Sequence, residues 1–199
     1  MIKCLGKINV PAYVLKDVKT RIPDRESYQL ASQSHKANLK DLDSSIHNLD
    51  GYDFYTNEAT TLKEYTKKSY LDLVPVTFLE YHSLNKPSNV VVLRVDPGSF
   101  TRPHVDTFKN SLLKNNKDLV FDDIVRLWIP LEDSTFGQVL FVGDQVLSSY
   151  KAGEVYTFDN YTLHSAANAG LDIRYTLLVY TTKSCLLYTS PSPRDFTES

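Results

Sequence analysis

Two histidines and an aspartate carry the chemistry that this sequence suggests. One residue separates His104 from Asp106, and side chains at positions i and i+2 of a β-strand point to the same face. The imidazole and the carboxylate can therefore bind one ion together, and His164, from a different strand, supplies a second nitrogen. Such a set leaves three positions of an octahedron open, which is the arrangement of non-haem Fe(II) oxygenases. The same residues also suit zinc, so ligand types alone do not identify the metal.

A buried arginine is expected close to these residues. Alternation along the last predicted strand places Arg174, Thr176, Leu178 and Tyr180 on one face and Tyr175, Leu177 and Val179 on the other. A guanidinium that begins an apolar run is expected near or inside a barrel, where it is costly unless an anion pairs with it. A dicarboxylate would supply that anion. The alternative is an ion pair of Arg174 with Asp172 or Glu154 at the rim.

Arg126 and Trp128 raise a similar question. Along this strand they face one way, while the apolar residues between and after them face the other. We interpret the pair as lining the site; the alternative is an outward cation–π pair on the solvent side. Four tyrosines could also reach a pocket, and the sequence does not select among them: Tyr81, Tyr150, Tyr161 and Tyr175.

Short strands separated by turn signals dominate the second half of the chain. We expect eight of them: Asn89–Val95, Phe100–Asp106, Ile124–Leu131, Gln138–Val142, Gln145–Tyr150, Glu154–Phe158, Thr162–Asn168 and Asp172–Thr182. Gly143-Asp144 suits a tight hairpin, because glycine supplies a positive φ. This pattern predicts a mainly β fold, a double-stranded β-helix of the jelly-roll or cupin-like kind, with an N-terminal α/β segment.

The first half of the chain is less regular. We expect an edge strand over 7–17, interrupted by Pro11, and helices over 24–42 and 58–73. The polar segment 107–123 is either an active-site cover or plain surface. These patterns divide the chain into an N-terminal segment, 1–87, that braces the barrel, a catalytic core, 88–183, and a flexible tail, 184–199, which resembles translated sequencing-adapter read-through.

Composition bounds the classes of partner. The 199 residues include 22 Lys and Arg against 24 Asp and Glu, a net charge of −2, so there is no broad basic field and we expect no nucleic-acid partner. The longest aliphatic run, Val90–Leu93, is too short for a membrane span, and no signal peptide is apparent. Two cysteines form neither a disulfide framework nor a zinc cage, which favours a cytoplasmic location. Oligomeric state is not indicated.

Four blocks of sequence, in order, resemble one enzyme family. They are Asp96-Pro-Gly-Ser-Phe-Thr-Arg-Pro-His-Val-Asp106, Arg126-Leu-Trp-Ile-Pro-Leu131, Gly153-Glu-Val-Tyr-Thr-Phe-Asp159, and His164-Ser-Ala-Ala-Asn168 followed by Arg174-Tyr-Thr-Leu-Leu178. Together they are similar to the aspartyl/asparaginyl β-hydroxylase-like branch of the 2-oxoglutarate and Fe(II)-dependent oxygenases, over about residues 88–182, roughly half of the chain.

The resemblance implies a role for each matching residue. His104, Asp106 and His164 would hold Fe(II), Arg174 would hold the distal carboxylate of 2-oxoglutarate, and Arg126 matches a position that contacts this cosubstrate in some members. Two positions depart from the family pattern: Trp128 stands where some members have a histidine near the cosubstrate, and Leu93 where some have a serine. Asp106, absent from some relatives, favours hydroxylation over halogenation.

The expected activity is therefore that of a 2-oxoglutarate and Fe(II)-dependent dioxygenase. It would use O2 to hydroxylate an amino acid or the side chain of a peptide or protein, an Asp, Asn or Pro-like group, and would release succinate and CO2. Two alternatives stay open at this point. One is a cupin-like metalloenzyme that does not use 2-oxoglutarate, and the other is a non-catalytic jelly-roll binding module.

Overall fold

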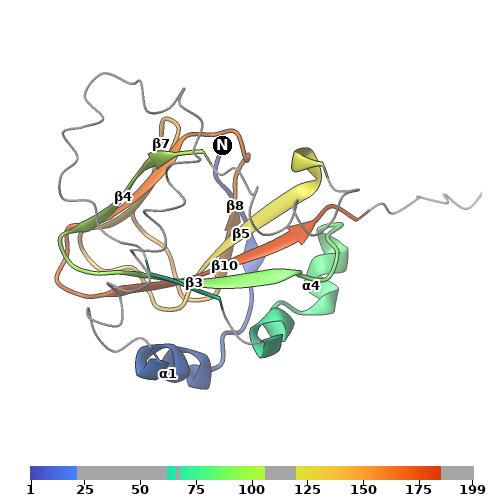
Figure 1. The fold of residues 1–199 in the computed structure, drawn as a ribbon, viewed down its shortest axis with the longest axis horizontal. Helices are drawn as coiled ribbons and strands as arrows, with labels where there is room; N and C mark the ends of the chain where they lie inside the picture. The colour runs from blue at the N-terminus through green and yellow to red at the C-terminus, as the bar shows by residue number, and fades with distance from the viewer. Residues whose placement is uncertain (22–61, 66–67, 106–119, 185–199) are drawn as a thin grey trace, which may run out of the picture.

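Two antiparallel β-sheets face each other in the computed structural model, which describes residues 1–21, 62–65, 68–105 and 120–184 (Figure 1). Within these residues the larger sheet has the strand order β1-β8-β5-β10-β3-β2, and the smaller has the order β4-β9-β6-β7. The strands are β1 Lys3–Lys7, β2 Leu62–Tyr65, β3 Asn89–Val95, β4 Ser99–His104, β5 Ile124–Pro130, β6 Gln138–Val142, β7 Gln145–Leu147, β8 Glu154–Thr157, β9 His164–Asn168 and β10 Arg174–Thr182. The arrangement is the predicted double-stranded β-helix.

The larger sheet is buried on both faces, because alternate side chains of its strands enter different cores. Leu127, Ile129, Leu177 and Val179 face outward and pack with Val14 and Val18 of helix α1 (Ala12–Arg21) and Leu79 of helix α4 (Val76–Tyr81). Trp128 and Leu178 face inward and pack with Leu140 and Ala166 of the smaller sheet. Figure 1 shows α1 and α4 on the side of the larger sheet away from β4 and β7. The inner core is therefore the layer in which a site can form.

The eight predicted strands are confirmed, with ends shifted by a few residues. β3 and β6 have the predicted bounds, and the strands expected over 100–106, 145–150 and 162–168 are shorter in the described residues. The Gly143-Asp144 hairpin is also confirmed: Val142 pairs with Gln145, and Gly143 has φ 58°. Only a two-residue turn fits between those partners, and this turn type needs the positive φ.

The strand expected over 7–17 is wrong for most of its length. The strand β1 precedes it and lies at the edge of the larger sheet beside β8, and Ala12–Arg21 forms helix α1. Pro11 comes immediately before the helix, where its fixed φ and missing N–H are tolerated. Val14 and Val18 are one helical turn apart and are both buried. That spacing is the helical signal, which the strand prediction misread.

The helix expected over 58–73 is also wrong where it can be compared. Leu62–Tyr65 is strand β2, antiparallel to β3, and Lys68–Leu73 is a 3-10 helix. Residues 62–65 form a strand because they make backbone hydrogen bonds to the edge of β3. Helix propensity, which depends on the local sequence alone, does not predict such pairing. The helix expected over 24–42 lies outside the described residues, as do residues 107–119 of the polar segment and 185–199 of the tail. Phe121–Asp123, at the end of the polar segment, forms a short 3-10 helix before β5.

Gly153 holds β1 against the rest of the fold, and a substitution there tests this contact. The Ile8 N–H donates to the Gly153 carbonyl at 2.8 Å, Gly153 has φ 81°, and a Cβ at this position would lie 2.2 Å from the Ile8 oxygen. Gly153→Ala should therefore lose about 2 kcal/mol or more of unfolding free energy, measured by urea denaturation. Gly98→Ala is the matched control, because Gly98 has φ 75° but no atom of the described residues lies within 4 Å of a Cβ placed there. Equal losses for the two variants would contradict the contact.

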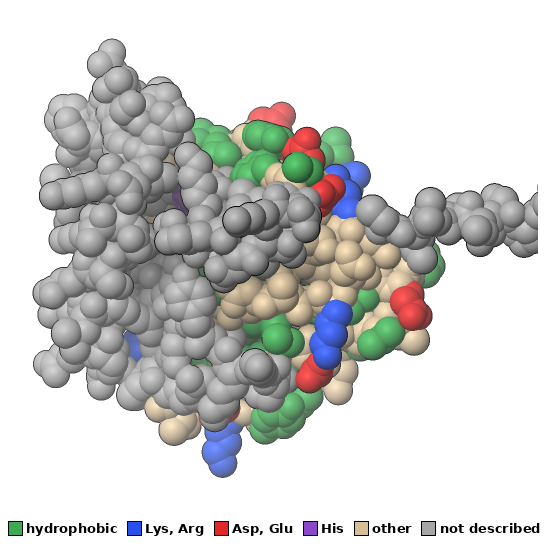
Figure 2. Space-filling view, turned by 45° about the vertical axis from the view of Figure 1, so that its right-hand side comes forward, with side chains coloured by type: hydrophobic (Ala, Val, Ile, Leu, Met, Phe, Trp, Pro, Cys, Tyr) green, Lys and Arg blue, Asp and Glu red, His purple; other side chains and the backbone are tan. Residues whose placement is uncertain are grey.

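Charged side chains of both signs are scattered over the described part of the face in Figure 2, with no field of a single sign. Among the described residues, none of the helices has the length and apolar character that a bilayer crossing requires.

Candidate active site

His104 and His164 lie together on the inner face of the smaller sheet. They are cross-strand partners in the pairing of β4 with β9, and their ring centroids are 4.3 Å apart. The register of this pair shifts between Thr101 and His104, so a local irregularity sets the position of His104. His164 is buried, and Phe158 packs against its ring at 5.0 Å. The sequence prediction that two separate strands bring these imidazoles together therefore agrees with the structure.

The hydrogen bonds of His164 determine which ring nitrogen carries a lone pair. Its Nδ1 lies 3.0 Å from the carbonyl oxygen of Thr162, and a carbonyl can only accept. Nδ1 therefore carries the proton, and Nε2 is the nitrogen that can accept a hydrogen bond or ligate a metal. Arg126 Nη1 lies 3.0 Å from Nε2 and donates to it in this structure. A guanidinium thus occupies the lone pair that a metal would use.

Arg126 faces inward, as the alternation along β5 predicts. It is buried, and its guanidinium carbon lies 4.2 Å from the centroid of the Phe158 ring. Burial lowers the pKa of Arg126 to about 10, and Tyr180 partly offsets this shift. Because the side chain is buried against Phe158, the alternative of an outward cation–π pair on the solvent side is wrong.

Arg174 is buried at the start of β10 without a carboxylate partner among the described residues. Its Nη1 donates to the Val139 carbonyl at 3.0 Å, and its Nε has no hydrogen-bond acceptor. No ion pair joins it to Asp172 or to Glu154, and the Glu154 carboxylate accepts from the Tyr156 hydroxyl and the Lys151 N–H instead. The rim ion pair is therefore absent, and burial lowers the pKa of Arg174 without a carboxylate to oppose it.

Thr176 is a site residue that the sequence argument did not single out. It lies two residues after Arg174 on the same face of β10, and its buried Oγ1 has no hydrogen-bond partner among the residues that the structure describes. Orphaned buried polar atoms are uncommon, and two on neighbouring side chains indicate a missing polar ligand. Its position two residues after Arg174, on the same face of the strand, was the feature of the sequence that could have identified it. A carboxylate fits here, because it accepts from both the guanidinium and the hydroxyl.

Trp128 packs between the sheets next to this polar pair. Its ring meets Tyr150 edge-to-face at 5.0 Å, and Tyr150 is buried, with an exposure of 2%. The structure thus selects Tyr150 from the four candidate tyrosines. Tyr175 is buried in the outer core, and Tyr81 and Tyr161 are exposed.

The distance between the histidine pair and Arg174 follows from strand register. His164 pairs with Val142 of β6, whereas Arg174 donates to the carbonyl of Val139 on the same strand. Three residues of β-strand span about 10 Å. His164 and the Arg174 guanidinium therefore lie near positions of β6 that are about 10 Å apart along the strand.

Asp106, the expected carboxylate ligand, lies outside the described residues. The part of the chain that the structure describes contains no group of three His, Cys, Asp or Glu side chains placed to hold a metal. His104 and His164 nevertheless fit as part of an iron site, because imidazole nitrogens are common iron ligands and the tautomer of His164 leaves Nε2 as the donor.

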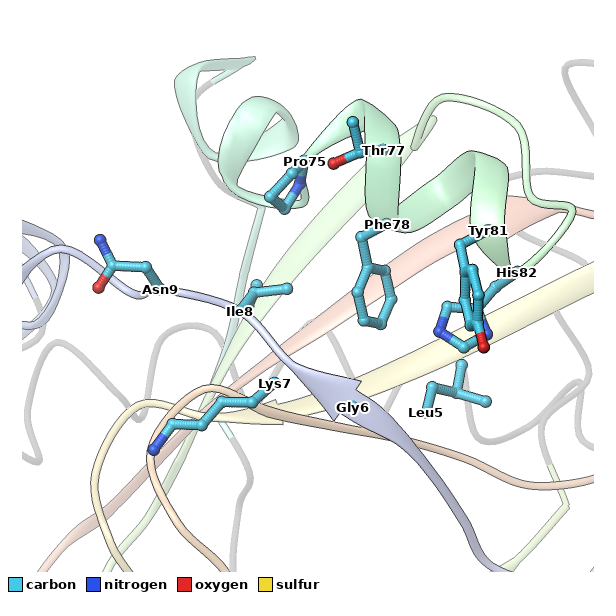
Figure 3. Close-up of a pocket in the computed structure, with 10 residues that line it drawn as sticks. All are labelled: Leu5, Gly6, Lys7, Ile8, Asn9, Pro75, Thr77, Phe78, Tyr81 and His82. Atoms are coloured by element: carbon cyan, nitrogen blue, oxygen red, sulfur yellow. The ribbon is translucent and has the colours of Figure 1, made fainter.

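A groove of about 500 Å³ lies elsewhere, between β1 and α4 (Figure 3). Its lining residues include Leu5, Ile8, Phe78 and Tyr81. The predicted metal ligands and the residues Arg126, Trp128 and Arg174 are not among them. Ile8 and Phe78 belong to the outer core, so this groove is separate from the layer that holds the histidines.

Fold and site together define a double-stranded β-helix enzyme with paired histidines and a buried arginine between its sheets. The sequence matches the family described as aspartyl/asparaginyl beta-hydroxylase over residues 26–183. The chain belongs to this family and is a hydroxylase, as the resemblance of the four blocks predicted.

Solved structures show a similar fold. EvdMO1 is 12% identical, with a TM-score of 0.50 over 91% of this chain and 47% of that one. A prolyl-4-hydroxylase from Pseudomonas putida is 14% identical, with a TM-score of 0.49 over 92% of this chain and 91% of that one. An uncharacterized protein with a double-stranded beta-helix domain from Klebsiella pneumoniae is 15% identical, with a TM-score of 0.38 over 68% of this chain and 90% of that one. No curated protein sequence matches the chain.

Proposed function

We propose that this hydroxylase is a 2-oxoglutarate and Fe(II)-dependent dioxygenase that acts on an amino acid or on a peptide side chain. The observation that carries the proposal is the buried Arg174 guanidinium, which has no carboxylate partner among the described residues and has an Nε without an acceptor. A buried cation of this kind is costly unless a bound anion compensates it. 2-Oxoglutarate is the dicarboxylate that a hydroxylase of this family would place there.

Each residue of the site has one task in this proposal. His104, Asp106 and His164 would hold the iron, and the Thr162 carbonyl keeps the proton on His164 Nδ1, which leaves Nε2 as the nitrogen that would ligate it. Arg174 and Thr176 bind the distal carboxylate of the cosubstrate. Trp128 and Tyr150, which pack edge-to-face, would cover one side of the site. Arg126, which donates to His164 Nε2 in this structure, would contact the cosubstrate if a metal were bound at that nitrogen.

Fe(II) with 2-oxoglutarate and O2 supplies, when bound, the oxidation that inserts one oxygen atom into a C–H bond and releases succinate and CO2. The contribution of the protein is positional. The chain holds the cosubstrate by its far end, fixes the protonation of the histidine ligand and surrounds the site with apolar side chains. The family description supports Asp or Asn as the group to be hydroxylated, and a Pro-like group is the next class to test. The small number of cysteines, two, favours a cytoplasmic location. The net charge of −2 gives no reason to expect a nucleic-acid partner.

Succinate release tests the proposal. The purified protein, loaded with Fe(II) and kept reduced with ascorbate, should convert 2-oxoglutarate to succinate, and a screen of free amino acids and Asp-, Asn- or Pro-containing peptides should yield one product heavier by one oxygen atom. Failure of the iron-loaded protein to form succinate, with or without any of these substrates, would overturn the assignment.

Thr176→Val should change stability and cosubstrate affinity in opposite directions. The substitution keeps the side-chain shape and removes a buried hydroxyl that has no partner, so the protein without ligands should be as stable as the wild type or gain about 1 kcal/mol. Affinity for 2-oxoglutarate should fall roughly 5- to 30-fold, because a hydrogen bond to a carboxylate is lost. Calorimetric titration and thermal melting measure the two effects.

Thr181→Val is the matched control on the same strand. The Thr181 hydroxyl is buried on the opposite face and donates to the Asn85 carbonyl at 2.5 Å. Its loss should destabilise the fold by about 1 kcal/mol and leave 2-oxoglutarate binding unchanged. If Thr176→Val destabilised the protein like Thr181→Val and bound 2-oxoglutarate normally, Thr176 would have no part in the site.

A further inference from the structure

The hydrogen bonds behind Arg174 run in one direction through two buried side chains. Tyr150 Oη lies 3.1 Å from Gln138 Oε1, and Gln138 Nε2 lies 3.2 Å from the Asp172 carbonyl oxygen. Tyr150 and Gln138 are both nearly inaccessible, with exposures of 2% and 4%. Asn168 Nδ2 donates to the same Asp172 carbonyl at 2.8 Å, which holds it in place.

The Asp172 carbonyl determines the donor-to-acceptor direction of these hydrogen bonds. The Asp172 carbonyl can only accept, so Gln138 must present its NH2 group there and its oxygen to Tyr150. The phenol then donates its only proton to Gln138 Oε1. Its oxygen is left to accept, and the hydroxyl interacts with the Arg174 guanidinium, which can only donate.

Arg174 is thus held by strand β6 in two ways. The Val139 carbonyl accepts a hydrogen bond from Arg174 Nη1. The adjacent residue, Gln138, accepts from the Tyr150 hydroxyl and so orients the oxygen that interacts with Arg174. Burial raises the pKa of Tyr150, so the phenol keeps the proton that it donates. Trp128 packs on the Tyr150 ring and holds it in position independently of the hydroxyl.

We propose that Gln138 and Tyr150 are positioning residues that act in series to orient the Arg174 guanidinium, and that this orientation sets the dicarboxylate length that the site accepts. The inference rests on the proposed use of 2-oxoglutarate. With the guanidinium fixed, its Nε points to one carboxylate position, so five-carbon 2-oxoglutarate is preferred to four-carbon oxaloacetate and six-carbon 2-oxoadipate. Without the relay the guanidinium can rotate, and both affinity and discrimination fall.

Three variants test the serial arrangement: Tyr150→Phe, Gln138→Met and the double variant. Trp128 is the only tryptophan of the chain and lies against Tyr150, so its fluorescence reports ligand binding. Under anaerobic conditions each single variant should bind 2-oxoglutarate about 5- to 10-fold more weakly. The double variant should bind no more weakly than either single one, because Gln138 acts only through the hydroxyl that Tyr150→Phe removes.

Kinetics separates positioning from structural damage. The KM for 2-oxoglutarate should rise with little change in kcat, and the preference for 2-oxoglutarate over oxaloacetate and 2-oxoadipate should narrow in all three variants. Wild-type affinity and length preference in Tyr150→Phe would overturn the relay, as would additive losses in the double variant. If the wild type itself bound no 2-oxoglutarate, the proposed function would fail instead, which keeps the two outcomes distinct.

Discussion

Arg174→Met should fold as stably as the wild type, or more stably, and should fail to bind 2-oxoglutarate at concentrations that saturate the wild type. The substitution removes a buried guanidinium that has no carboxylate partner among the described residues, and replacing such a charge by an apolar side chain is often neutral or stabilising. The bound carboxylate, in contrast, loses its charged partner. That loss is expected to cost roughly 3–5 kcal/mol, or about 100- to 1,000-fold or more in affinity.

Titration of 2-oxoglutarate against Trp128 fluorescence measures the affinity, and thermal melting without ligand measures the fold. In the wild type, saturating 2-oxoglutarate should raise the melting temperature, because the ligand binds only the native state. In Arg174→Met this shift should disappear. Arg94→Met is a contrasting control, since Arg94 is a buried arginine of the same sheet that forms an ion pair with Asp96 at 2.8 Å. Its loss should destabilise the protein and leave cosubstrate binding intact. Normal 2-oxoglutarate affinity in Arg174→Met would instead favour a metalloenzyme that does not use this cosubstrate.

His164→Ala should abolish metal binding and turnover while leaving a folded protein. Loss of a partner that merely supports a metal ligand costs about 10- to 100-fold, so loss of the ligand itself should exceed this range. Equilibrium dialysis with Fe(II), or the visible spectrum of the Co(II)-loaded protein, measures metal binding directly. Succinate release then measures the consequence for activity.

His82→Ala is the matched control for this variant. His82 lies against Phe78 and Tyr81 at the end of α4, in the separate groove of Figure 3, so its loss should leave metal binding and turnover at the level of the wild type. Wild-type metal affinity in His164→Ala, or equal losses in His164→Ala and His82→Ala, would contradict a metal site at His164.

Local pattern was a sufficient guide wherever one face of an element is plainly apolar. The strands from 88 onward were predicted from two-residue alternation, because the sheet buries alternate side chains in different cores. The same alternation correctly placed Arg126, Trp128 and Arg174 on the inner face. The N-terminal part was predicted less well. There, strand β2 pairs with β3 through backbone hydrogen bonds. Such pairing leaves no regular pattern of apolar and polar side chains in the sequence of β2.

The sequence alone determined which histidines form the pair and which arginines face inward. Their residue types and alternate spacing leave few arrangements on a buried sheet. Only the tertiary structure decided what surrounds them. The Thr162 carbonyl on His164, the orphaned hydroxyl of Thr176 and the path from Gln138 through Tyr150 to Arg174 depend on which strands become neighbours and in what register. Such contacts join residues distant in the chain, and register is set by the packing of the whole core rather than by any one segment.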